Sequence, residues 1–316
     1  MKFRLLSLSL LVALSSLGSC QRSRAVGPPK AVAVRSDGAI ELNLMSFNVR
    51  YENPGDLDDH AWRQRVTGAV RMIRREAPDI IGVQEALHGQ AADLWASLPD
   101  YEFFGIGRDD GLRAGEYSGI FYRKERFKPD PDDHGTFWLS DTPAVVGSRT
   151  WGNEIPRVAA WIRLIDLSTM RGFYVFNTHW DHRNQESRER AALLIAQRID
   201  TRKQVDEPVT LIGDFNSLLS NPGIVYLTGK SGVVAGSKQS WSNGLSDAYQ
   251  TLHSNEKNHS TTLHFWKGSR EGEVKIDHIL VSRGAKIEAA EIVSDDKPVV
   301  SDHFPVTARI LFPLTK

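Results

Sequence analysis

Apolar and polar residues alternate along several short segments of the chain, which is typical of strands with one buried face. The runs 80–84 and 209–213 are mostly apolar and rich in branched side chains, which indicates strands buried on both faces. Residues 62–76 and 184–202 instead repeat apolar positions every three or four residues, which predicts amphipathic helices. Further predicted strands are 40–49, 101–105, 117–123, 158–166, 172–178, 275–281 and 305–312, and shorter helices are 89–97, 222–227 and 247–252.

The order of these elements predicts the fold class. Strands and helices do not keep alternating as they do in doubly wound nucleotide-binding folds. Many strands and few helices fit an α+β fold, in which two mostly antiparallel sheets pack face to face with helices outside. Residues 127–138, which contain Pro129 and Pro131, are predicted to be irregular, and residues 229–244 to form a surface loop.

The N-terminus has the pattern of an export signal. Lys2 and Arg4 precede an apolar stretch, 5–17, that is too short to anchor the chain across a bilayer. The following Leu-Gly-Ser-Cys resembles a bacterial lipobox, in which the cysteine receives a lipid. Because Cys20 is the only cysteine in the chain, we favour a lipoprotein signal over a plain secretory signal with a chance cysteine.

The chain therefore divides into a lipoprotein signal peptide (1–20), a flexible tether (21–38) and one folded domain (39–316). The tether is polar and contains Gly27-Pro28-Pro29. We expect an exported, membrane-anchored lipoprotein in the periplasm or at the cell surface, which touches the membrane only through its N-terminal lipid.

The net charge of the chain bears on whether its partner is a nucleic acid. The 316 residues contain 39 Lys and Arg and 39 Asp and Glu, so the formal net charge is zero. A general nucleic-acid binder would carry an excess of basic residues. A local basic groove remains open, so nucleic acid stays an alternative partner.

Candidate chemistry starts at residues 211–216, Leu-Ile-Gly-Asp-Phe-Asn. Gly213 ends the strand, and Asp214 and Asn216 point to the same side because they are two positions apart, whereas Phe215 points into the core. An Asx-turn closed by Asn216 is the alternative.

Other polar residues also lie at or near the ends of predicted strands. They are Asn48, Glu85, His179, His182, Asp277, Asp302 and His303. Each one alone could cap a turn or a helix, but so many of them at strand ends favour one shared site.

The residue types suit hydrolysis of a phosphate ester. Glu85 and Asp302 offer hard oxygen ligands for Mg²⁺ or Mn²⁺, and Asn48 could add a carbonyl oxygen or orient a ligand. Zinc is disfavoured, because the chain has no available cysteine and no His-Glu-x-x-His motif.

Other residues of the set can activate the attacking water and bind the phosphate group. We expect Asp214 to hold or deprotonate the attacking water, Asn216 to position the phosphate or the nucleophile, and His179 to donate to a phosphoryl oxygen. His303, paired with Asp277, would be a second donor, because a carboxylate raises the pKa of an imidazole.

These residues lie in six short motifs: Ser46-Phe47-Asn48-Val49, Gln84-Glu85, Asn177-Thr178-His179, Gly213-Asp214-Phe215-Asn216, Ile276-Asp277-His278 and Ser301-Asp302-His303-Phe304-Pro305. The set resembles the motifs of the endonuclease/exonuclease/phosphatase superfamily, the deoxyribonuclease I-like fold. The resemblance extends from about residue 40 to the end and is strongest to a largely uncharacterised bacterial secreted branch. It implies a four-layer α/β/β/α sandwich and a divalent-metal phosphoesterase site.

The resemblance also implies roles for individual residues. It places Asn48 and Glu85 at the metal, and Asp302 beside the metal or against the histidine that follows it. The catalytic residues that it implies are His179, Asp214, Asn216, Asp277 and His303.

The resemblance leaves the substrate open. Arg50 stands where DNA-repair members tend to place an acid, which weakens an abasic-site function. Candidates to line the substrate pocket are Arg50, Arg108, Asp110, Glu116, Trp151 and Arg157, although the arginines could be paired charges and Trp151 could pack its loop. We expect a monomeric phosphoesterase acting on phosphodiesters or phosphomonoesters that are small or carbohydrate-linked; the alternative is a secreted nuclease acting on DNA or RNA.

Overall fold

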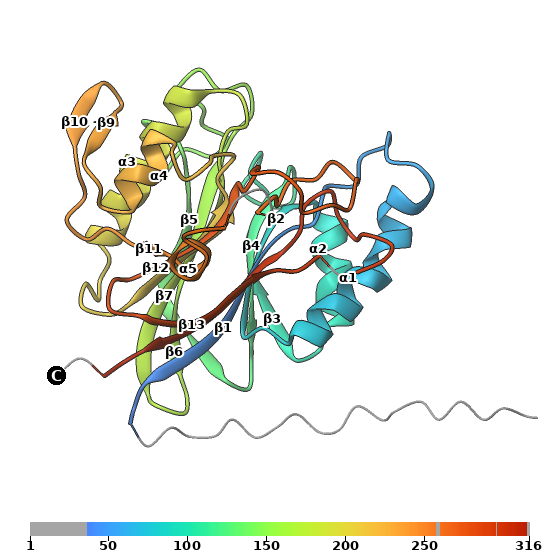
Figure 1. The fold of residues 1–316 in the computed structure, drawn as a ribbon, viewed down its shortest axis with the longest axis horizontal. Helices are drawn as coiled ribbons and strands as arrows, with labels where there is room; N and C mark the ends of the chain where they lie inside the picture. The colour runs from blue at the N-terminus through green and yellow to red at the C-terminus, as the bar shows by residue number, and fades with distance from the viewer. Residues whose placement is uncertain (1–36, 257–259, 295, 315–316) are drawn as a thin grey trace, which may run out of the picture. The chain divides into compact units, whose positions relative to one another are not determined.

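The computed structural model describes residues 37–256, 260–294 and 296–314 (Figure 1). The predicted signal peptide and nearly all of the predicted tether lie outside the described residues. Within the described ranges, no helix has the length and apolar character needed to cross a membrane.

Two six-stranded sheets form the centre of the described fold. The first has the order β13-β14-β1-β2-β4-β3, and only β1 and β2 pair in parallel within it. Its strands are β1 (Ile40–Asn48), β2 (Ile80–Ala86), β3 (Tyr101–Phe104), β4 (Tyr117–Arg123), β13 (Lys286–Ile292) and β14 (Val306–Phe312). The first and last long strands of the domain are thus neighbours, with Ile40 opposite Phe312.

The second sheet has the order β11-β12-β8-β7-β6-β5, and only β7 and β8 pair in parallel within it. Its strands are β5 (Phe127–Trp138), β6 (Val158–Asp166), β7 (Arg171–His179), β8 (Val209–Asp214), β11 (Ser246–Asp247) and β12 (Asp277–Val281). Both sheets are therefore mostly antiparallel, as predicted.

Helices cover the outer face of each sheet, so the predicted four-layer sandwich is confirmed (Figure 1). α1 (Trp62–Glu76) and α2 (His88–Ser97) pack on the first sheet, and α3 (Gln185–Asp200) and α4 (Pro222–Leu227) on the second. A third apolar cluster, which includes Leu44 and Ile212, fills the space between the sheets. The remaining short elements are η1 (Asp58–His60), α5 (Ala248–Leu252), β9 (Gly232–Val234) and β10 (Ser237–Gln239).

The periodic pattern of α1 explains its position. Ala69, Val70 and Ile73 are buried on one side, which fits the apolar stripe seen in the sequence. The helix ends because Ala77 adopts a left-handed backbone with φ 48°, directly before Pro78.

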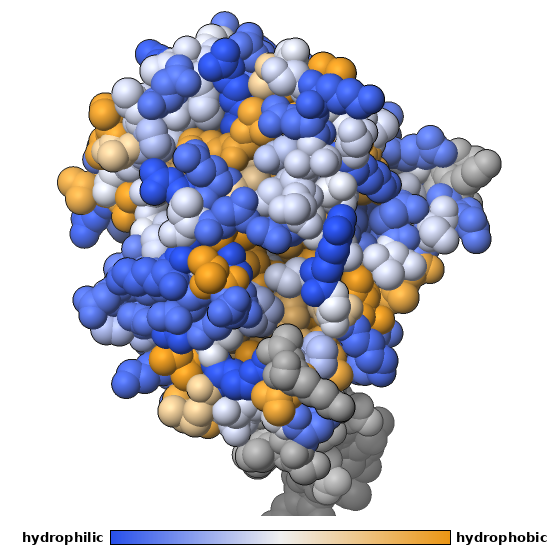
Figure 2. All heavy atoms as spheres, turned by 90° about the vertical axis from the view of Figure 1, so that its left-hand side faces the viewer, coloured by the Kyte–Doolittle hydropathy of each residue, from blue (hydrophilic) through white to orange (hydrophobic). Residues whose placement is uncertain are grey.

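On the other side of the molecule, the face that carries α3, α4, β9 and β10 is mainly hydrophilic, with apolar residues in separate patches (Figure 2).

Three segments differ from the prediction. Residues 127–138 are a strand, β5, not an irregular stretch; the prolines are accommodated because β5 is an edge strand whose register shifts between Pro129 and His134. The predicted loop 229–244 contains the β9–β10 hairpin. The edge strand β13 has no counterpart in the prediction.

The topology gathers the polar residues at one edge of the sandwich. β1, β7 and β8 end at Asn48, His179 and Asp214, and the parallel pairs place these ends alongside neighbouring strand ends. β12 runs antiparallel to β8, so that Asp277 at its start lies opposite Asp214.

Candidate active site

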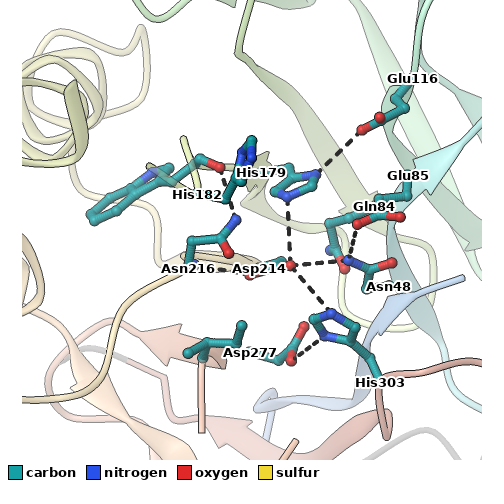
Figure 3. Close-up of polar contacts among 12 residues, drawn as sticks. Asn48, Gln84, Glu85, Glu116, His179, His182, Asp214, Asn216, Asp277 and His303 are labelled. Carbon is teal, nitrogen blue, oxygen red and sulfur yellow. Dashed lines mark hydrogen bonds and ion pairs between the residues drawn. The ribbon is translucent and has the colours of Figure 1, made fainter. Parts of the chain in front are cut away.

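The carboxylate of Asp214 lies at the centre of the polar cluster, and the side chain is 1% exposed. Its Oδ2 accepts a hydrogen bond from Asn48 Nδ2 at 3.0 Å and lies 3.5 Å from His179 Nε2 and 3.9 Å from His303 Nε2. The two imidazoles approach the carboxylate from opposite sides (Figure 3). Residues from both sheets therefore converge on one oxygen atom.

The surroundings of Asp214 raise its proton affinity. Burial, and secondly the neighbouring carboxylate of Asp277, raise the pKa of Asp214 to about 7. Asp214 Oδ1 accepts a hydrogen bond from the backbone N–H of Asn216 at 2.9 Å, which fixes the orientation of the carboxylate. A buried carboxylate with this pKa is suited to accept a proton from water near neutral pH.

Asp277 and His303 form the predicted pair. Asp277 Oδ2 lies 2.9 Å from His303 Nδ1, and both side chains are buried. Burial by itself would lower the pKa of His303, but the attraction of Asp277, Asp214 and Asp302 raises it to about 10. The charge and hydrogen bond of His303 in turn outweigh burial and lower the pKa of Asp277. The pair is thus an imidazolium held by a carboxylate.

His179 differs from His303 in its charge. Burial, and secondly the guanidinium of Arg157, lower the pKa of His179 well below its ordinary value, so its imidazole is neutral. Its Nδ1 lies 3.6 Å from Glu116 Oε2 and has no hydrogen-bond partner among the described residues. A neutral imidazole has one N–H, so the tautomer decides whether the proton faces Glu116 or Asp214.

Acidic oxygens that could hold a cation lie beside this group. The negative charge of Glu85 acts on Asp302: burial, followed by the repulsion from Glu85, raises the pKa of Asp302. Arg50 Nη1 is 3.7 Å from Asp302 Oδ2. Two acids that repel each other at a partly buried place fit a bound Mg²⁺ or Mn²⁺.

Two groups of side chains offer ligand atoms within 4.8 Å of one another: Glu85, His179 and Asp214, and Asp214, Asp277 and His303. The positive charge of His303 repels a cation from the second group, whereas Glu85 of the first group interacts electrostatically with Asp302, a further oxygen ligand. Asn48 donates its amide to Glu85 Oε1 at 3.0 Å and accepts from the backbone N–H of Arg50 with its carbonyl oxygen. The Asn48 amide therefore orients the carboxylates of Glu85 and Asp214. Glu85 has a left-handed backbone, with φ 64°, and this turns its side chain out of the strand.

Three of the predicted pocket residues, Arg50, Arg108 and Glu116, form ion pairs. Arg50 binds Asp56 through Nε at 2.8 Å, and Arg108 binds Glu116 through both terminal nitrogens at 2.6 and 2.8 Å. Arg157 is 3% exposed, and its Nε and Nη1 have no hydrogen-bond partner in the described parts of the chain.

Two of the proposed pocket residues serve the structure of their loops. Trp151 packs in the apolar cluster between α3 and the second sheet, and its indole N–H donates to Asp141 Oδ1 at 2.7 Å. Asp110 is exposed and accepts hydrogen bonds from the backbone N–H groups of Leu112 and Ala114. Asn216, with φ 46°, donates its amide to the carbonyl of Trp180 and so holds the turn after β8.

Comparisons with known proteins agree with this geometry. Residues 45–303 match the model of the Endonuclease/Exonuclease/phosphatase family. The chain belongs to this family. A comparison with curated protein sequences finds no match.

Several solved structures of the family are similar to the chain. An endonuclease/exonuclease/phosphatase from Bacteroides vulgatus is 33% identical, with a TM-score of 0.77 over 86% of this chain and 99% of that one. A mannosyl-6-phosphatase from Bacteroides thetaiotaomicron is 29% identical, with a TM-score of 0.75 over 86% of this chain and 100% of that one. The catalytic domain of human Nocturnin, at 18% identity and a TM-score of 0.66, shares the fold over 86% of this chain and 93% of that domain.

Two residues of the family motifs, Gln84 and Asn177, form a polar bridge between the two sheets. Gln84 of β2 donates to Asn177 Oδ1 of β7 at 2.7 Å, and Asn177 donates to the carbonyl oxygens of Val83 and Gly119. Both side chains are fully buried. Although the motifs contain both residues, a bridge could not be foreseen, because it depends on which strands face each other.

Two hollows in the surface differ in their distance from the site. One of about 340 Å³ is lined by Arg171 and Val209, which begin β7 and β8, so it lies at the far end of these strands. Another of about 510 Å³ is bordered by Asp181 and His182, just after His179.

Proposed function

We propose that the protein is a divalent-metal-dependent phosphoesterase that hydrolyses phosphodiester or phosphomonoester bonds of small, carbohydrate-linked molecules by attack of an activated water. The observation that supports this most is the buried contact of Asp214 with two imidazoles, one neutral and one protonated, next to two acids that repel each other. Such a set joins a base, two donors and a cation site in one place.

In this proposal, Glu85 and Asp302 hold Mg²⁺ or Mn²⁺, and Asn48 orients Glu85. The bound cation would polarise a phosphoryl oxygen and stabilise the leaving oxygen. Arg50 neutralises part of the acidic charge, since Asp56 and Asp302 both lie next to its guanidinium.

Asp214 acts as the base. Asn216 fixes one of its oxygens, and the other faces the two imidazoles, where a water molecule and a phosphoryl group would meet. His303 offers a positive charge to the phosphoryl oxygens, and neutral His179 donates its remaining N–H to another of them.

The small, carbohydrate-linked class of substrate has two supports. The chain has no net positive charge to hold a polynucleotide, and the similar Bacteroides thetaiotaomicron protein is a mannosyl-6-phosphatase.

The test is a hydrolysis assay with Mg²⁺ and with Mn²⁺, each with an EDTA control. The substrates are p-nitrophenyl phosphate, bis(p-nitrophenyl) phosphate and plasmid DNA. We expect EDTA-sensitive release from at least one small ester and no DNA cleavage. Nicking of the plasmid would instead favour a secreted nuclease, and silence with all three would contradict the proposal.

The variant Asp214→Asn should abolish the activity while the protein stays folded. The amide keeps the shape of the side chain but cannot accept a proton from water, so kcat should fall about 10²–10⁴-fold. Circular dichroism would confirm the fold. Wild-type activity in this variant would remove Asp214 from the role of base.

A further inference from the structure

We propose that the hollow of about 510 Å³ beside His182 binds the part of the substrate beyond the phosphate, and that this part is a hydroxyl-rich group such as a sugar ring. The inference rests on the proposed phosphoesterase function and names its substrate class more narrowly. The volume lies within the roughly 300–1,000 Å³ of small-molecule sites.

The hollow opens next to the reacting centre. His182 borders it and follows His179 by three residues, and both histidines belong to the group of side chains in Figure 3. The loop 152–155 forms another wall of the hollow. Asn184, which caps α3, donates its amide to the carbonyl of Trp151 at 3.0 Å and so fixes the start of this loop to the helix. We place the ester group of a phosphate held at His179 on this side of the site, where the hollow offers room for it.

His182 is set up as a hydrogen-bond donor. Its Nδ1 lies 3.1 Å from Nη2 of Arg157. A guanidinium has no acceptor, so Nδ1 must accept this bond and the neutral imidazole must carry its proton on Nε2. Burial, and secondly the charge of Arg157, lower the pKa of His182, which keeps the ring neutral. The buried arginine thus fixes the tautomer of an exposed histidine.

The wall also offers hydrogen-bond acceptors. The carboxylates of Glu154 and Glu186 line the hollow and are exposed, whereas the unpaired Oδ1 of Asn153 is shielded from solvent. A hydroxyl group can donate to one of these carboxylates and accept from His182, which is why hydroxyl groups suit the hollow.

The charge of the lining argues against a second phosphate. Glu154, Asp181 and Glu186 line the hollow, against Arg183 as the one lining cation among the described residues. A polynucleotide would bring further phosphates into this acidic place, whereas a neutral sugar would not.

The experiment compares a hexose 6-phosphate with p-nitrophenyl phosphate for the wild type and for His182→Ala, under the metal conditions of the assay above. Loss of one hydrogen bond should raise KM for the hexose 6-phosphate about tenfold. The value of kcat/KM for p-nitrophenyl phosphate, whose ring has no hydroxyl groups, should change less than about twofold. His182→Gln keeps a donor and should recover most of the sugar preference. His134→Ala, which removes an exposed histidine on β5, is the matched control and should change neither substrate.

The outcomes separate the two proposals. Equal losses on both substrates, or no loss on either, would overturn the sugar subsite and leave the phosphoesterase intact. A wild type that hydrolyses p-nitrophenyl phosphate but no hexose phosphate would do the same. A wild type inactive on every ester would overturn the proposed function itself.

Discussion

At the scale of single residues, the charge on His303 depends on its buried partner. Asp277 accepts its hydrogen bond, and the raised pKa of about 10 keeps the imidazole protonated at neutral pH. Asp277→Asn removes the negative charge but keeps a similar shape. The pKa of His303 should then fall, because burial favours its neutral form.

We predict that Asp277→Asn lowers kcat at pH 7.5 about 10²-fold or more and that the basic limb of its pH profile moves to lower pH, because His303 loses its proton at lower pH without the carboxylate. The measurement is the pH profile of kcat with p-nitrophenyl phosphate for wild type and variant. Asp110→Asn, on an exposed loop, is the control. An unchanged profile would show that the charge of His303 does not depend on Asp277.

The raised pKa of Asp214 predicts the acid limb of the wild-type profile. As a base it must be deprotonated, so activity should rise with pH through the pKa, which is about 7 without a cation. Bound Mg²⁺ or Mn²⁺ adds positive charge nearby and lowers this pKa. The midpoint of kcat/KM should therefore move to lower pH as the metal concentration increases. A midpoint independent of metal would contradict this.

Residues of the site differ in how far the sequence predicts them. Asp214, His179 and His303 were found because each is a polar residue next to a predicted strand, and the structure brings them together. Trp151 has a partly polar ring in a loop, so the sequence could not tell a pocket wall from loop packing, and the structure buries it. His182 carried the same strand-end signal as His179, but its contact with Arg157 requires the fold.

At the scale of elements, one buried charge cluster fastens β12 to its surroundings. Asp247 caps α5 by accepting from the backbone N–H of Gln250, and its Oδ2 lies 3.3 Å from Lys275 Nζ and 2.7 Å from His278 Nδ1. His278 Nε2 in turn contacts the carbonyl of Ser217, after β8. The cluster therefore joins α5, β12 and the turn that carries Asn216.

We predict that Asp247→Asn lowers the free energy of unfolding by about 3–5 kcal/mol, because Lys275 is left buried without its acid. Burial would raise the pKa of Asp247, but Lys275 and His278 lower it below its ordinary value. Its stabilisation is therefore complete above the unfolded pKa of about 3.9 and is lost as pH falls further. Urea unfolding at pH 7 and at pH 3 measures both effects. A variant with the same acid sensitivity as the wild type would contradict the assignment.

Elements were predictable where their own pattern is strong. The boundaries of α1, α4, β4 and β6 match the prediction, because each element begins or ends at or beside a proline, glycine or charged residue. β5 was not predicted, because its prolines and acidic residues argue against a central strand and the sequence does not reveal which strands are edges.

At the scale of the whole molecule, the proposed lipid at Cys20 would hold the enzyme at a membrane. We predict that Cys20→Ser moves the protein from the membrane fraction to the soluble fraction of cells that express it, without loss of phosphatase activity. Fractionation with an antibody against the folded domain gives the measurement. A wild type that is already soluble would contradict lipidation.

The pairing of β1 with β14 has a consequence for biosynthesis. β14 lies between β13 and β1, and His303 comes just before it. Neither the first sheet nor the site can therefore be completed before the ribosome has made the last segment of the chain. A nascent chain that stops before this segment lacks a central strand and one of the imidazoles facing Asp214. We therefore expect no phosphatase activity until synthesis is complete. A chain threaded through a membrane would then close its sheet, and become active, only on the far side.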